Sequence, residues 1–163
     1  MDDIIKAREA WFNDYASCVE QGVVKAANAG TLYVCPCCDY PTLDERGGYD
    51  ICPLCNWEDD GQDDPHADEV WGGPNGRYSL TEARENFKKS LIMFGEYDPR
   101  IGGADSALEK QAKVTIIEAF EQMRGEKDAV VLSVLWDQVN QGRAMLHQET
   151  LRKVHEYEEQ HIL

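Results

Sequence analysis

The chain has 163 residues, 42% of them apolar, which is enough for one domain with a hydrophobic core. Its 31 acidic and 16 basic residues give a formal net charge of −15, which repels phosphate backbones, so we expect no direct nucleic-acid partner. The start of the sequence is too charged for a secretory signal, and no apolar run is long enough for a membrane helix. We therefore expect a cytoplasmic protein with no membrane contact.

The first half of the chain falls into three segments of different composition. Apolar residues recur at three- and four-residue steps over residues 3–28, which predicts an amphipathic helix. Residues 31–57 contain two short extended pieces, TLYV and YDIC, separated by proline and glycine. Residues 58–78 are rich in glycine and proline, which predicts an irregular loop.

The rest of the chain is predicted to be helical. The sequences SLTE at 79–82 and SALE at 106–109 have the capping-box pattern, so we expect helices from Ser79 to near Gly95 and over 106–124. The run over 128–141 could be a buried strand, but its length favours a helix. A last helix is expected over about 143–160, and it could continue the previous one through Gly142.

The expected architecture is therefore α+β: mainly α, with a small β module that resembles a zinc ribbon, and four or five helices around a single core. We treat residues 1–163 as a single domain. The zinc-ribbon-like insert with its acidic loop covers 31–78, between the helical segments 1–30 and 79–163.

Two copies of one cysteine pattern carry the clearest chemical signal. CPCCD at 35–39 and CPLCN at 52–56 are both Cys-Pro-x-Cys followed by Asp or Asn, which tolerate the positive φ that such a turn requires. Two C-x₂-C pairs separated by 13 residues are typical of a structural tetrahedral Zn²⁺ site. The predicted zinc ligands are Cys35, Cys38, Cys52 and Cys55. Iron could bind to the same four sulfurs. Two disulfides or free thiols are a less favoured alternative, because the compartment is expected to be reducing. A thioredoxin-like redox motif is also less favoured, because it would need only one C-x₂-C pair.

Two cysteines remain outside the predicted ligand set. Cys37 would have to displace its neighbour Cys38 to bind the metal, so we expect it to lie beside the ligands or to be an exposed thiol. Cys18 falls on the first predicted helix, where a buried apolar role is expected.

The segment from YVCPCCDYP through ICPLCNWEDDGQDD to GPNGRYSLTEARENF closely resembles the bacterial cysteine-rich CPCC domain family, over about residues 33–97. One departure is Asp39, where the family favours glycine. The resemblance implies zinc binding, carries no established enzymatic activity, and is associated with immunity partners of polymorphic toxins. It implies nothing about residues 100–163.

The segment from Trp57 to Trp71 holds seven acidic residues and no Lys or Arg. It could be a solvated loop, a docking surface for a basic partner, or a divalent-metal site. An EF-hand with Gly61 at its sixth position would need Glu at residue 67, where Ala67 stands, so a calcium loop of that kind is excluded. We expect the bracketing aromatic residues to anchor the loop. The candidate partner-binding residues are Asp59, Asp60, Asp63, Asp64, Asp68 and Glu69.

No nucleotide-binding or hydrolase motif is present, and His66 alone does not make a catalytic site, so we name no catalytic residue. The function that these observations favour is a non-enzymatic, zinc-containing acidic binding protein. Its expected partner is a basic protein, and more narrowly a bacterial toxin, plausibly a nuclease, that it would neutralise as an immunity protein. The alternatives are a redox-regulatory or enzymatic zinc protein that uses Cys37 or the acidic loop, and a zinc-ribbon transcription accessory protein.

Overall fold

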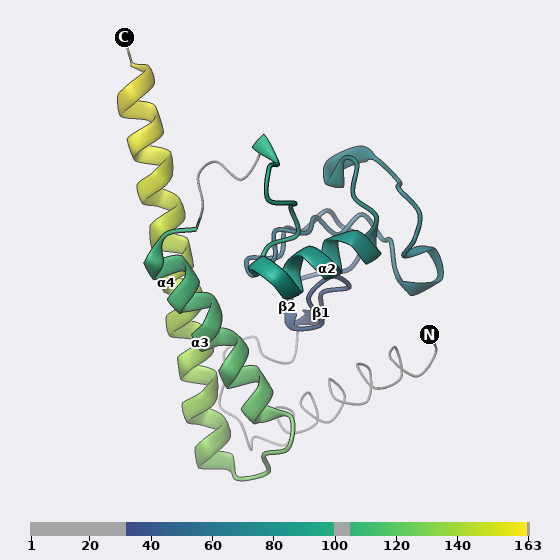
Figure 1. Ribbon diagram of the computed structural model, residues 1–163. Coiled ribbons are helices and arrows are strands. Elements are labelled where there is room, and N and C mark those ends of the chain that lie inside the picture. Colours follow the sequence, from purple (N-terminus) through teal and green to yellow (C-terminus); the bar gives the residue numbers. More distant parts are fainter. Residues whose placement is uncertain (1–31, 100–104, 163) are drawn as a thin grey trace.

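The computed structural model describes residues 32–99 and 105–162 (Figure 1). Their secondary structure is two short strands, two 3₁₀ helices and three α helices. In chain order these are β1 (Tyr33–Val34), β2 (Pro41–Leu43), η2 (Asp64–His66), η3 (Gly73–Asn75), α2 (Leu80–Ser90), α3 (Ala107–Met123) and α4 (Ala129–His161). The prediction of a mainly helical protein with a small β module is confirmed, and the β module is a two-stranded antiparallel sheet. The three helices are fewer than the four or five expected for the whole chain, and the helix expected over 3–28, with Cys18, lies outside the described residues.

Of the two extended pieces expected over residues 31–57, one contains a strand. β1 lies in the predicted TLYV piece and pairs antiparallel with β2, Tyr33 opposite Leu43. The predicted YDIC piece contributes only one isolated bridge, between Ile51 and Glu58. Each pairing joins the two segments that flank one cysteine turn. The chain reverses direction within a few residues at each turn, so the segment before the turn pairs with the segment directly after it.

Helix α2 begins as predicted and ends early. The Ser79 hydroxyl accepts a hydrogen bond from the Glu82 amide at 3.1 Å, which caps the helix. The helix ends at Ser90, and its C-cap residue Leu91 has a left-handed φ of 57°, four positions before Gly95. The Met93 amide then donates to the Cys55 carbonyl at 2.8 Å, so the chain leaves the helix to reach the second cysteine turn.

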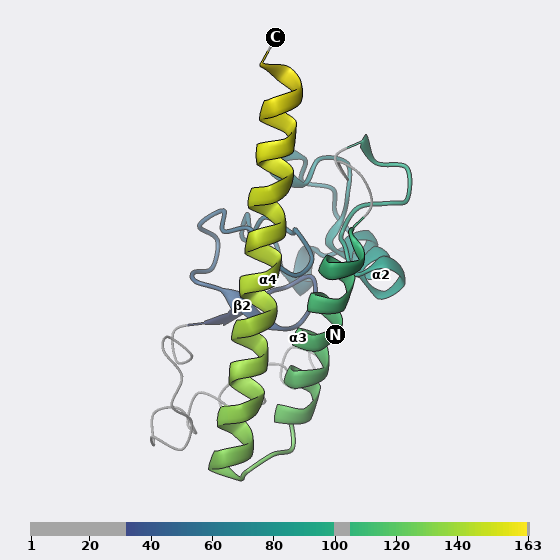
Figure 2. The ribbon, with the colours of Figure 1, turned by 90° about the vertical axis from the view of Figure 1, so that its left-hand side faces the viewer.

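Helices α3 and α4 form an antiparallel pair that covers one side of the cysteine-containing region (Figure 2). The capping box of Ser106 and Glu109 is present at the start of α3, and the Asp128 side chain caps α4 by accepting from the amides of Val130 and Val131. The segments predicted as 128–141 and 143–160 are one helix that passes through Gly142 without a break. The ambiguous run after Asp128 is therefore helical and not a strand.

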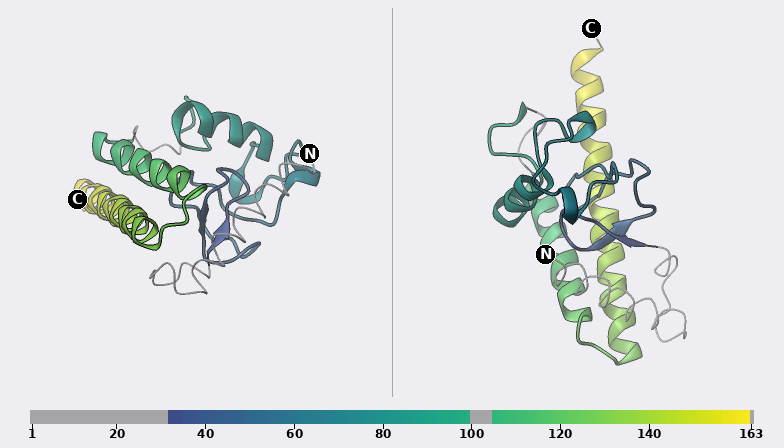
Figure 3. Two further views of the ribbon diagram at one scale, coloured as in Figure 1. Left: turned by 90° about the horizontal axis from the view of Figure 1, so that it is seen from below. Right: turned by 90° about the vertical axis from the view of Figure 1, so that its right-hand side faces the viewer.

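Figure 3 shows α3 and α4 side by side next to the cysteine-containing region. The two parts share one buried cluster, which includes the cysteines and residues of α3 and α4. Tyr40, next to the first cysteine turn, stacks on Phe120 of α3 with 5.6 Å between ring centroids, and its hydroxyl donates to Glu121 at 2.7 Å. Lys113 of α3 donates to the Leu91 carbonyl at 2.9 Å. These contacts hold the helical pair against the cysteine region. Among the described residues, no helix has an apolar stretch long enough to cross a membrane.

Candidate metal centre

The two cysteine turns have the same backbone geometry. In the first, the Asp39 amide donates to the Cys35 carbonyl at 3.0 Å; in the second, the Asn56 amide donates to the Cys52 carbonyl at 2.9 Å. Asp39 and Asn56 have φ of 66° and 68°, so both adopt the left-handed conformation predicted for them. Each turn therefore presents its two thiols on the same side of a tight loop.

The two turns bring four thiols to a common point. The donor sulfurs of Cys35, Cys38, Cys52 and Cys55 all lie within 4.8 Å of one another, and all four residues are buried. Cys35 Sγ lies 3.7 Å from Cys55 Sγ, and Cys38 Sγ lies 3.7 Å from Cys52 Sγ. Four sulfurs bound at about 2.3 Å to one tetrahedral ion would be about 3.8 Å apart, so this arrangement fits a four-coordinate metal.

Burial affects the ionisation of these thiols strongly. It raises the pKa of Cys35 to about 11, and the pKa values of Cys38 and Cys55 well above that of an ordinary thiol. Burial acts on Cys52 in the same direction, but hydrogen bonds from the other three thiols and from Thr42 outweigh it and lower the pKa of Cys52 well below its usual range. Burial of four neighbouring thiols thus opposes their simultaneous ionisation, and a cation bound among them would offset this cost.

Polar neighbours orient the sulfurs. The Thr42 hydroxyl of β2 lies 2.9 Å from Cys52 Sγ, and the Trp57 amide donates to Cys55 Sγ at 3.4 Å. Thr42 was not identified from the sequence, and no local signal singles it out, because its position beside the sulfur depends on the pairing of β2 with β1. Such hydrogen bonds hold metal ligands in place and stabilise their negative charge.

Cys37 lies beside the cluster and is not one of its four members. Its side chain is only 3% exposed, and its hydrogen bond to Cys55 contributes to the raised pKa of Cys55. Of the two roles considered from the sequence, the structure favours a thiol next to the ligands over an exposed thiol.

The comparison with protein families gives one finding. The model of the family described as Cysteine-rich CPCC matches residues 33–100. This segment is a cysteine-rich CPCC domain. The matched range holds both cysteine turns, the acidic loop and α2, and it leaves out α3 and α4. No curated protein and no solved structure gives a significant match to the chain.

The acidic loop of the CPCC domain is tied to the rest of the domain by buried ion pairs. The Asp59 side chain is fully buried and accepts from Arg46 Nε and the Gly47 amide, both at 2.8 Å. The Asp64 side chain is 2% exposed and is paired with Arg84 of α2. Arg84 also donates to the Pro36 carbonyl at 2.8 Å, so this pair joins the loop to the first cysteine turn. Asp59 and Asp64 therefore hold the acidic loop in place, and their expected role in partner binding stays a prediction.

The other four candidate carboxylates lie at or near the surface but also have contacts within the domain. Asp60 accepts from the Gln62 amide at 3.1 Å, and Asp63 accepts from Arg46 at 2.7 Å. Asp68 accepts from the Thr81 hydroxyl at 2.6 Å, and Glu69 accepts from Trp71 Nε1 at 3.0 Å. The segment is thus an ordered loop of the CPCC domain that is exposed in part and is tied by local Asp caps and turns. Within residues 32–99 and 105–162, no carboxylate or histidine group of three or more has a metal-binding arrangement.

The aromatic residues that bracket the acidic loop behave in two ways. Trp57 is fully buried and Tyr78 is 1% exposed, so both anchor the loop as predicted. Trp71 is 46% exposed and packs against His66, with 5.7 Å between ring centroids. His66 accordingly contacts Trp71 and Glu69 at the surface of the CPCC domain.

Proposed function

We propose that the four-cysteine cluster binds one zinc ion and that the site is structural. The observation that carries this proposal is the closure of the cluster: four buried sulfurs at tetrahedral spacing leave no position for water or substrate. Zinc is favoured over iron because structural Cys₄ sites formed by two C-x₂-C turns are typical zinc sites. The ion would bind two sulfurs from each cysteine turn and so join the two turns.

We further propose that the chain is a non-enzymatic binding protein whose partner is a basic protein. Its formal net charge of −15 supports this, and four thiolates around Zn²⁺ would add a net charge of about −2. Such a field attracts a positively charged partner and accelerates association. More narrowly, we propose a cytoplasmic immunity protein that neutralises a bacterial toxin, with a basic nuclease as the best match to this charge.

Metal analysis of the full chain, purified without added metal, tests the first proposal. We expect about one zinc per chain and loss of fold on removal of the ion, because the bonds from the metal to the two cysteine turns contribute to the free energy of folding. An iron content near one per chain, or an apo protein that keeps its near-UV circular dichroism, would overturn the structural zinc proposal.

The second proposal is tested by affinity capture with the zinc-loaded chain from its native cytoplasm. We expect a basic protein that is released as salt is raised, since exposed charges are screened beyond about 8 Å at physiological ionic strength. The captured protein is then assayed for toxicity and for nuclease activity, with and without an excess of the chain. Capture of a neutral or acidic protein would contradict the basic-partner proposal, and a basic protein with no toxic activity would contradict the immunity proposal alone.

A further inference from the structure

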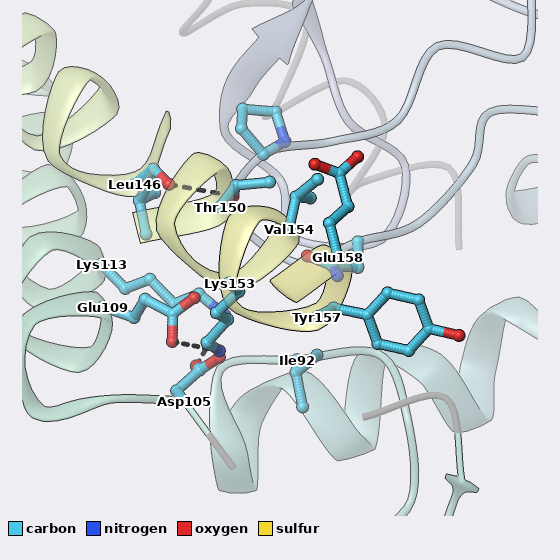
Figure 4. Close-up of a pocket in the computed structure, with 12 residues that line it drawn as sticks. Ile92, Asp105, Glu109, Lys113, Leu146, Thr150, Lys153, Val154, Tyr157 and Glu158 are labelled. Atoms are coloured by element: carbon cyan, nitrogen blue, oxygen red, sulfur yellow. Dashed lines mark hydrogen bonds and ion pairs between the residues drawn. The ribbon is translucent and has the colours of Figure 1, made fainter. Parts of the chain in front are cut away.

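The C-terminal half of α4 forms one wall of a groove that lies beside the second cysteine turn (Figure 4). The groove has a volume of about 490 Å³ and is walled by α4, the start of α3, the segment after α2 and the second cysteine turn. Its apolar lining residues are Pro53, Ile92, Leu146, Val154 and Tyr157.

The charged groups of this groove are mostly paired within the protein. Lys113 is bound to Asp105 at 2.8 Å and Lys153 to Glu109 at 2.7 Å. The first pair joins the residue before α3 to a later turn of that helix, and the second joins α3 to α4. Both pairs therefore hold the walls of the groove together. The apolar side chains and Glu158 are left as the groups that can recognise an occupant.

The apolar side of the groove is open to solvent. Val154 is 49% exposed and Tyr157 is 64% exposed, and Leu151, one turn earlier on α4, is 55% exposed. Tyrosine is common in the centres of protein interfaces because it buries a large ring at little entropic cost. Exposed apolar residues at this spacing, next to a groove, are typical of a docking site for an apolar side chain of another molecule.

Charge indicates what this occupant is. Of the three glutamates in residues 154–163, Glu156 is paired with Arg152 and Glu159 lies 3.2 Å from His155, whereas Glu158 lines the groove. A second copy of this chain, with the same charge of −15, would bring like charges together at this end of α4. A cationic segment would instead find the Glu158 carboxylate beside the apolar surface.

We propose that this groove is where the basic partner docks: an apolar side chain of the partner enters between Val154, Ile92 and Pro53, and a neighbouring Lys or Arg pairs with Glu158. This inference rests on the proposed function, because the occupant is a segment of the same basic protein. It moves the main contact from the acidic loop, whose Asp59 and Asp64 are buried, to the groove beside α4.

The groove depends on the metal centre. Pro53 and Asn56 belong to the second cysteine turn, and the bond from the Met93 amide to the Cys55 carbonyl at 2.8 Å positions the neighbouring Ile92. Loss of the metal therefore disassembles one wall of the groove, and docking there requires the loaded protein.

Two synthetic peptides test this assignment on the full, zinc-loaded chain. The first has lysines and leucines in a helical amphipathic pattern, and the second replaces every leucine with serine while keeping length and charge. We expect the leucine peptide to bind roughly tenfold or more tightly and to shift the amide NMR signals of Ile92, Val154 and Tyr157. Val154→Asp should remove this difference between the peptides. Val134→Asp, at a 51% exposed valine of the same helix outside the groove, should leave it intact.

The outcomes separate this inference from the proposed function. Equal binding of both peptides, or shifts centred on Asp68 and Glu69, would overturn the groove and leave a basic partner in place. If the protein captured from the cytoplasm is basic but binds the Val154→Asp variant with the same affinity as the parent, the groove is likewise not its docking site. Concentration-dependent shifts of the same signals in the chain alone would mean that a second copy is the occupant, which overturns the inference. Failure of both peptides and of every basic protein to bind overturns both proposals.

Discussion

Replacing Gly142 by alanine tests the packing of α4 against α3. A Cβ atom at Gly142 would lie 2.5 Å from Ile116 Cγ1, 3.0 Å from Ile116 Cδ1 and 3.1 Å from the Ala112 carbonyl oxygen. Contacts this short require one helix to move, and the nearest atoms are a branched side chain near its own backbone and a backbone oxygen. Glycine is therefore required here by the close approach of the two helices.

The magnitude follows from two opposing effects. Alanine in place of glycine inside a helix stabilises it by about 1 kcal/mol, because the unfolded chain loses less entropy. Forcing an additional carbon into a packed interface costs about 1–3 kcal/mol. We therefore expect Gly142→Ala to lower the free energy of unfolding by about 1 kcal/mol, which is opposite in sign to the propensity effect alone.

Urea unfolding of the zinc-loaded protein, followed by circular dichroism, measures this change as a shift of midpoint at constant slope. Gly125→Ala is the matched control, since a Cβ there meets nothing within 4 Å, and it should be neutral or slightly stabilising. In an Ile116→Ala background, Gly142→Ala should cost less than in the parent, because the nearest clash is gone. If Gly142→Ala alone stabilises the protein by about 1 kcal/mol, the helices do not approach each other as described.

Three further predictions concern the centre and its surroundings. Cys37→Ser should keep the metal content of the parent while Cys38→Ser loses it, measured as metal per chain; equal loss would mean that the ligand set is wrong. Arg84→Met should lower the free energy of unfolding by roughly 3–5 kcal/mol because Asp64 loses its cation in a buried site, whereas Lys88→Met, which removes an exposed pair, should change it by less than about 1 kcal/mol. Burial acts to raise the pKa of Glu109, but hydrogen bonds from Lys153 and the Ser106 amide lower it overall. Its contribution is therefore complete above the unfolded pKa of about 4.3 and is lost as the pH falls through the lower folded value, so the difference in melting temperature between parent and Glu109→Gln should shrink below about pH 4. A difference that stays constant down to pH 2 would contradict the lowered pKa.

Features that depend on neighbouring residues could be predicted from the sequence. The left-handed turns at Asp39 and Asn56 follow from the residue types after each C-x₂-C pair. The starts of α2 and α3 follow from Ser79 and Ser106, because a cap is formed within three residues of the helix start. The four cysteines that lie together are the four chosen by spacing, since two tight turns leave few ways to place their sulfurs.

Features that depend on distant residues were decided by the tertiary structure. Asp59 and Asp64 look like surface charges in the sequence, but each is buried against an arginine, Arg46 at 13 and Arg84 at 20 residues' distance. Gly142 looks like a possible break between two helices, whereas it is the point where α4 passes close to α3. In each case the local sequence specifies only the side chain, or its absence at a glycine. A residue distant in the sequence then decides the outcome: an arginine determines that a carboxylate is buried and not solvated, and a neighbouring helix determines that a glycine allows close packing and does not interrupt its helix.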